Sequence, residues 1–256
     1  MAGRSIDLNA DLGEGFGAYE LGDDEAILRH VTSANVACGF HAGDPQVIDR
    51  TVERAVKAGV AIGAHPSHHD LRGFGRRPIT ASPAEVEADV VYQVGAVLAF
   101  ARSHGARLVH VKAHGALYNQ AAVDASLARA IARGVARVSR ELVFVGAASS
   151  AAMRQAAEAE GLHFAAEAFV DRAYAKDGTL VPRGRPGAVI TDTAIAAARA
   201  VQIARDGHVA AEDGTELALE ADTLCLHGDT PGAVAHARAV RAALEAAGIA
   251  VRALAP

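Results

Sequence analysis

Ile6–Gly17 reads IDLNADLGEGFG and predicts the first strand of the fold and the turn that follows it. Apolar and polar side chains alternate along its first half, with Asp7, Asn9 and Asp11 on one face of the strand. The glycine-rich turn carries a further acid, Glu14. A solvated edge strand has the same alternation. The elements that follow therefore decide whether this polar face is buried.

After this stretch the chain alternates strands with helices, which is the order of a parallel sheet covered on both faces. A length of 256 residues suits one (β/α) barrel. We expect an α/β fold, a distorted single-domain (β/α) barrel of about seven parallel strands over residues 1–256, with a small hairpin insertion near 208–220. An open doubly wound sheet is the alternative. The later strands are expected near residues 33–38, 60–64, 107–114, 142–146, 162–169 and 223–226.

The composition argues against several classes of protein. A formal charge of -5 at pH 7 does not suit nucleic acid or an anionic membrane as the main partner. No apolar segment follows Met1, and no apolar run reaches about 18 residues. Cys38 and Cys225 lie far apart without CxxC spacing, as expected for buried thiols in a reducing compartment. We expect a cytoplasmic protein.

Polar side chains recur at the carboxyl ends of most predicted strands, always on the same face. In the fourth strand, for example, Lys112 and His114 share one parity while Val109 and Val111 share the other. Inward side chains gathered at the carboxyl ends of parallel strands are typical of a barrel active site. The residues that this pattern brings together are Asp7, Asn9, Asp11, Asn35, His41, His65, Lys112, His114, Glu167, His227 and Asp229.

The residue types leave the chemistry of this site open. A cluster of acids and histidines can hold a divalent cation, with Asp11, His41 and His65 as candidate ligands, or it can act as an acid–base pair without metal. Lys112 in a buried strand needs a carboxylate partner, for which Glu167, Asp7 and Asp11 are candidates, or a catalytic role. Two long loops rich in arginine follow strand ends, where they suit a carboxylate or a phosphate. There is no G-x-x-x-x-G-K-[ST] phosphate-binding loop.

Several blocks of the sequence resemble those of the LamB/YcsF family, and the resemblance covers nearly the whole chain. The chain departs from the family pattern at Ala113, where proline is usual, at His68-His69, where Tyr-Pro is usual, and at Val170, where alanine is usual. The matching blocks are Asp7–Glu14, Ala37–Pro45, Gly73–Arg77, His114–Asn119, Asp177–Arg183 and His227–Gly232.

The resemblance implies a barrel related to the polysaccharide-deacetylase-like folds and the ATP-dependent cleavage of 5-oxo-L-proline (pyroglutamate) to L-glutamate. It also implies a complex with 5-oxoprolinase subunits B and C. ATP is then a co-substrate, which we expect to be handled largely by the partner subunits. On this hypothesis the catalytic residues are Asp11, His41, His65, Lys112, His114, Glu167, His227 and Asp229. The substrate-binding residues are Asp7, Asn9, Glu14, Arg72, Asn119, Asp171, Arg172 and Arg183.

Two alternatives come from other classes of protein. The acids and histidines and the related fold also suit a stand-alone, metal-dependent amidohydrolase or carbohydrate deacetylase. A non-catalytic, substrate-binding subunit has the same binding residues without the chemistry. Metal content, and activity without ATP or partners, separate these alternatives from the ATP-dependent reaction.

Overall fold

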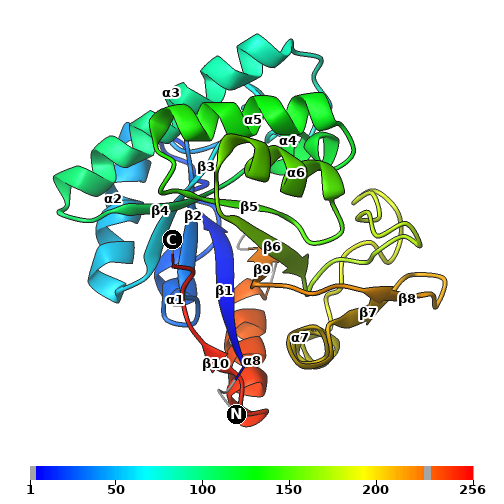
Figure 1. Cartoon of the computed structure of the whole chain (residues 1–256). Helices are drawn as coiled ribbons and strands as arrows, with labels where there is room; N and C mark the ends of the chain where they lie inside the picture. The colour runs from blue at the N-terminus through cyan, green and yellow to red at the C-terminus, as the bar shows by residue number, and fades with distance from the viewer. Residues whose placement is uncertain (1–3, 228–231, 256) are drawn as a thin grey trace.

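The computed structural model describes residues 4–227 and 232–255, and its centre is a closed barrel of parallel strands (Figure 1). Strand β1 pairs with β2 on one side and with β9 on the other, which closes the barrel. The predicted barrel of seven parallel strands is confirmed. The barrel strands, in spatial order, are β1 (Ser5–Leu12), β2 (Ser33–Ala37), β3 (Ala61–His65), β4 (Leu108–Lys112), β5 (Val143–Ala147), β6 (Phe164–Phe169) and β9 (Thr223–His227).

Helices surround the barrel, and several begin at residues that cap their free N–H groups. Asp44 accepts hydrogen bonds from the Gln46 and Val47 N–H groups, and Ser82 forms a capping box with Glu85. No helix in the described part of the chain is long and apolar enough to span a bilayer. The helices are α1 (Asp24–Leu28), α2 (Pro45–Ala58), α3 (Pro83–Ser103), α4 (Gly115–Ala121), α5 (Ala125–Val138), α6 (Ala151–Glu160), α7 (Thr193–Asp206) and α8 (Ala233–Ala246).

The two faces of β1 have different surroundings, as its alternation predicts. Leu8, Ala10 and Leu12 are fully buried and belong to the apolar core between barrel and helices. Asp7, Asn9 and Asp11 are also buried. Because the apolar face packs outward against the helices, these polar side chains lie inside the barrel. The polar face of this strand is therefore not a solvated edge.

One element differs from the sequence-based expectation. The short helix α4 directly follows β4 and is not expected from the sequence, because Gly115 opens it and its short sequence has no clear apolar stripe. The C-terminal strand β10 (Ala250–Val251) is short and pairs with the first residues of β1. Strands β7 (His208–Ala210) and β8 (Glu216–Ala218) pair antiparallel where the sequence predicts a hairpin.

Candidate active site

A pocket of about 420 Å³ opens at the carboxyl ends of the barrel strands. Its volume lies within the range of small-molecule sites, roughly 300–1,000 Å³. Strand residues form its floor, and the loops after β3, β4 and β6 form its walls. The charged and polar residues that line it include Asp11, His65, Arg76, Lys112, His114, Tyr118, Asn119, Glu167, Arg172, Arg183 and His227.

Lys112 is the centre of the pocket floor. Its Nζ lies 3.0 Å from Asp11 Oδ1 and 2.9 Å from Glu167 Oε1, so the ammonium is held between two carboxylates. The same nitrogen is 3.0 Å from Cys225 Sγ and 3.3 Å from Asn9 Oδ1. All these side chains are buried. We call this group (Asn9, Asp11, Lys112, Glu167 and Cys225) the lysine network.

The charges of the lysine network stabilise one another. Burial disfavours the charged form of Lys112, yet the charges of Asp11 and Glu167 raise its pKa well above its usual value. Burial likewise opposes ionisation of Asp11, but His65 and Lys112 hold the pKa of that carboxyl well below its usual range. Burial raises the pKa of Cys225, so the thiol stays protonated. Lys112 is therefore a fixed positive charge and not a proton acceptor.

A layer of amides and a histidine orients this network from below. Asn35 donates to Asn9 Oδ1 at 2.7 Å and to Asp11 Oδ1 at 2.8 Å. His110 Nε2 lies 2.7 Å from Asn35 Oδ1, and burial lowers the pKa of His110 to about 3. A neutral His110 with its proton on Nε2 therefore donates to Asn35. Gly63 leaves room for this ring, since a Cβ there would lie 2.0 Å from His110 Nε2.

Asp7 lies one layer deeper, and it is not one of the described residues that line the pocket. It accepts hydrogen bonds from the hydroxyls of Thr32, Ser33 and Thr223. Burial is the main reason that the pKa of Asp7 is raised. Its contacts orient the barrel interior, and they leave it without the access to substrate that its predicted binding role requires.

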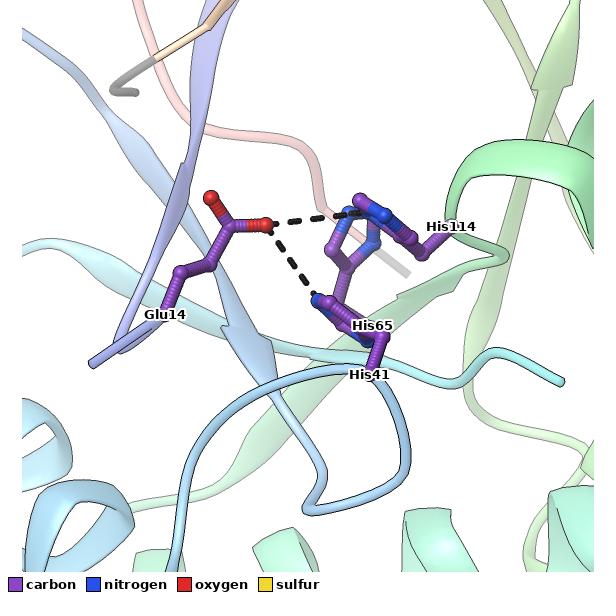
Figure 2. A group of neighbouring side chains, drawn as sticks. All are labelled: Glu14, His41, His65 and His114. Atoms are coloured by element: carbon purple, nitrogen blue, oxygen red, sulfur yellow. Dashed lines mark hydrogen bonds and ion pairs between the residues drawn. The ribbon is translucent and has the colours of Figure 1, made fainter. Parts of the chain in front are cut away.

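Three histidines and a glutamate form a second group at the rim of the barrel (Figure 2). Glu14 follows β1, and His41 lies between β2 and α2. His65 is the last residue of β3, and His114 immediately precedes α4. One ligand atom of each lies within 4.8 Å of the others, and all four side chains are buried. We call this group (Glu14, His41, His65 and His114) the histidine cluster. It contains two of the three predicted metal ligands, while Asp11 belongs to the lysine network.

The two groups touch at one point, where His65 Nε2 lies 3.3 Å from Asp11 Oδ2. Within the cluster, Glu14 Oε1 is 3.2 Å from His41 Nε2 and 3.7 Å from His114 Nδ1. Burial is the main cause that lowers the pKa of both His41 and His114 well below the usual value, so both rings are neutral. Phe74, whose carbonyl contacts His114, is the one non-glycine residue with positive φ in the described part of the chain.

A second acid–histidine pair lies where β6 and β9 end, next to Arg172. Asp171 Oδ2 accepts from the His227 backbone N–H at 3.1 Å and lies 2.8 Å from His227 Nδ1. Burial opposes ionisation of Asp171, but His227 lowers the pKa of this carboxyl. Arg172 donates to the carbonyls of Val181 and Ala188, which fixes its guanidinium. Burial lowers the pKa of Arg172 to about 10.

Most of the predicted site residues gather around the pocket. Asn119, Arg172 and Arg183 line it directly. Arg72 is exposed and is not among the described lining residues, whereas Arg76 from the same loop is. Asp229 lies outside the described residues.

Two residues at the pocket are missing from the site residues predicted from the sequence. Cys225 has the inward parity of His227, and that shared parity is the signal that could have identified it. Tyr118 belongs to helix α4, and its buried hydroxyl interacts with Glu167 but has no hydrogen-bond partner of good geometry among the described residues. Glu167 Oε2 is likewise buried without such a partner in the described ranges. Burial, followed by the charge of Glu167, raises the pKa of Tyr118 well above its usual value.

Comparison with known proteins identifies relatives across nearly the full chain. The model of the LamB/YcsF family matches residues 6–256. The A subunit of the 5-oxoprolinase of Methylococcus capsulatus is 56% identical over 98% of this chain and 96% of its own length. That of Bordetella pertussis is 55% identical over 97% of this chain and 98% of its own length. The crystal structure of a lactam utilization protein from Thermus thermophilus is 49% identical, with a TM-score of 0.92 over 98% of this chain and all of that chain.

Proposed function

The chain belongs to the LamB/YcsF family, and from this premise we propose that it acts as the A subunit of a multi-subunit 5-oxoprolinase. The proposed reaction is the ATP-dependent cleavage of 5-oxo-L-proline to L-glutamate. The observation that carries the proposal is the lysine network at the floor of a pocket walled by arginines. A small anionic lactam needs such a cationic site of limited volume.

The stability of the substrate explains the need for ATP. A lactam is a resonance-stabilised amide, so its carbonyl carbon is a poor electrophile. Transfer of the γ-phosphoryl group of ATP to the lactam oxygen leaves an activated carbon, to which water adds. The C–N bond then breaks, the ring nitrogen takes a proton, and an acyl phosphate remains. A second water molecule hydrolyses the acyl phosphate to give glutamate and phosphate.

The substrate carboxylate is assigned to the arginine wall. Arg172 is held by two carbonyl groups, and Arg183 and Asn119 line the same pocket. A guanidinium presents paired N–H donors that match both oxygens of a carboxylate. This arrangement favours an anionic substrate over the neutral lactam of the same size.

The lactam group itself is assigned to the pocket floor. A lactam offers one N–H donor and one carbonyl acceptor, and these match the buried Glu167 Oε2 and the buried Tyr118 hydroxyl. The fixed charge of Lys112 stabilises negative charge that develops on the lactam oxygen or on the transferred phosphoryl group. Lys112 acts here by electrostatics, because its raised pKa prevents it from accepting a proton.

Proton transfer is assigned to His227. Its Nδ1 is bound by Asp171, which orients the ring. His227 also lines the pocket, where it can receive a proton from water and deliver one to the ring nitrogen. Since the sequence has no phosphate-binding loop, much of the ATP handling is assigned to subunits B and C.

Reconstitution with subunits B and C tests this proposal. Glutamate and phosphate release should require ATP, 5-oxoproline and all three subunits. Asp11→Asn removes the charge that holds Lys112 and should lower glutamate release by at least about 100-fold, since positioned charged groups contribute effects of that size. Asp49→Asn changes an exposed acid on α2 and should leave the rate unchanged. Full glutamate release by Asp11→Asn would refute the assignment.

The histidine cluster favours one second candidate, a stand-alone metal-dependent amidohydrolase. Such an enzyme would release product from the chain alone, without ATP or partners. The same reconstitution therefore separates the two reactions. A non-catalytic role would show as 5-oxoproline binding with no loss of rate in any pocket variant.

A further inference from the structure

The hydrogen bonds of His65 and His114 define which ring nitrogen carries the proton in each. His65 Nδ1 lies 2.7 Å from the Lys112 carbonyl oxygen, and His114 Nε2 lies 2.9 Å from the Phe74 carbonyl oxygen. A carbonyl oxygen only accepts, so both of these nitrogens carry hydrogen. Unless one of the rings binds a second proton, His65 Nε2 and His114 Nδ1 are therefore bare lone pairs. These two atoms face each other at 3.0 Å.

His41 is oriented in the same way. Ser67 donates its hydroxyl hydrogen to the His68 carbonyl, so its oxygen accepts from His41 Nδ1 at 3.1 Å. His41 Nε2 is then also a lone pair, and it faces Glu14 Oε1 at 3.2 Å. Three lone pairs and a carboxylate oxygen thus converge, and each ring is fixed by an oxygen on its far side. Metal-binding histidines are fixed by the same kind of outer contact.

We propose that the histidine cluster is a binding site for a divalent transition metal ion such as Zn²⁺. Without an added proton or a cation, lone pairs facing each other at 3.0 Å repel. Ligands about 2.0–2.1 Å from a tetrahedral ion lie about 3.3 Å apart. Three of the six pairs in the cluster lie 3.0, 3.2 and 3.7 Å apart, and all lie within 4.8 Å. Imidazole nitrogens with one carboxylate suit zinc and similar ions better than magnesium or calcium.

The ring orientations distinguish the ligands. The His65 ring is perpendicular to that of His114, at 86°, so the lone pairs of these two rings can converge on one ion. The rings of His41 and His114 are stacked at 3.7 Å and are parallel within 3°. Parallel rings cannot both point at one ion, so His41 must tilt to become the fourth ligand. His65, His114 and Glu14 are therefore assigned as the primary ligands.

The neighbouring group Asp11, Cys225 and His227 is a weaker candidate for a cation. Its ligand atoms also lie within 4.8 Å of one another. However, the Lys112 ammonium is 3.0 Å from both Asp11 Oδ1 and Cys225 Sγ. A positive charge already occupies this place, and it would repel a second cation.

Metal content of the purified full-length chain, without an affinity tag, tests the site directly and requires no assumption about the reaction. After incubation with Zn²⁺ and gel filtration, mass spectrometry of the metal should find about one equivalent per chain. His65→Gln and His114→Gln should each weaken zinc binding by more than about 100-fold, since outer contacts alone contribute about 10–100-fold. Ser67→Ala, which removes the contact behind His41 together with the bond to the His68 carbonyl, should weaken it by about 10-fold or more.

His68→Gln is the matched control, because His68 is a buried histidine of the same loop that contacts Gln120 outside the cluster. It should bind zinc as the unchanged chain does. Circular dichroism confirms that each variant is folded. Cobalt(II) substitution gives a second readout, since visible absorption bands should appear and be lost in His114→Gln. The proposal would be overturned if the unchanged chain retained no metal, or if it and His65→Gln bound zinc equally. A proton shared between His65 Nε2 and His114 Nδ1 would then explain their close approach.

Discussion

The lysine network and the histidine cluster lie side by side at one end of the barrel. They meet where His65 of the histidine cluster contacts Asp11 of the lysine network. In the lysine network, a donor of opposite charge sits between two carboxylates, so the group is complete with protein atoms alone. In the histidine cluster, acceptor atoms face one another, and the donors of the rings point outward. Buried polar groups can therefore either stabilise a fixed charge of the protein or form a binding site for an external cation.

The largest expected effect comes from breaking the lysine network. Lys112→Met leaves Asp11 and Glu167 buried without their shared cation and should lower the free energy of unfolding by about 3–5 kcal/mol. Urea unfolding measures this loss. Lys57→Met, which removes an exposed pair with Glu53, should change stability by less than about 0.5 kcal/mol.

A double variant sharpens this test. Adding Glu167→Gln to Lys112→Met removes one of the two uncompensated carboxylates and should recover part of the lost stability. If Lys112→Met alone lost less than about 1 kcal/mol, the two carboxylates would not depend on the ammonium, and the contrast with the histidine cluster would disappear.

A smaller effect is expected from the support beneath the lysine network. Gly63→Ala would place a Cβ 2.0 Å from His110 Nε2, so the ring must shift away from Asn35. Overpacking of this kind should lower the free energy of unfolding by about 1–3 kcal/mol. Gly95→Ala is the control with the opposite sign. Nothing lies within 4 Å of its added Cβ, and alanine should favour helix α3 by up to about 1 kcal/mol. Equal effects of the two changes would contradict the close contact at Gly63.

The smallest effect concerns the support of the histidine cluster. Asp44 caps α2 and also accepts from the Gly17 N–H, so it joins the segments that carry Glu14 and His41. Asp44→Ala should lower the free energy of unfolding by about 1 kcal/mol at pH 7. Backbone N–H groups of Val47 and Gly17 lower the pKa of Asp44 in the folded chain.

The lowered pKa of Asp44 also sets the pH at which this effect is seen. A carboxyl whose pKa is lower in the folded state stabilises the fold above its unfolded pKa, about 3.9, and this contribution is lost as the pH falls through the folded value. The difference between the unchanged chain and Asp44→Ala should therefore be full at pH 7 and shrink below about pH 4. Unfolding curves at several pH values measure it, and a difference independent of pH would rule out the charged cap.

Strand alternation was a good guide to which side chains face inward, but not to how deep they lie. Asp7, Asn9 and Asp11 share one face of β1, and all are buried as predicted. Their order along β1 places Asp7 deeper than Asp11, and the structure adds that Asp7 is bound by hydroxyls while Asp11 lies beside Lys112. The loops have no repeating pattern, so nothing in the sequence distinguished the exposed Arg72 from Arg76, which lines the pocket.

The sequence by itself determined the barrel, the inward face of its strands and the family, because alternation, helix caps and the residue spacing within each block are local properties of the chain. Tertiary structure decided that, of its three candidate partners, Lys112 pairs with Asp11 and Glu167, and that Glu14 joins three histidines. These contacts join residues up to about 100 positions apart, since strands distant in sequence become neighbours only when the barrel closes. The direction of each imidazole proton depends on the carbonyl or hydroxyl behind the ring, which folding brings into place.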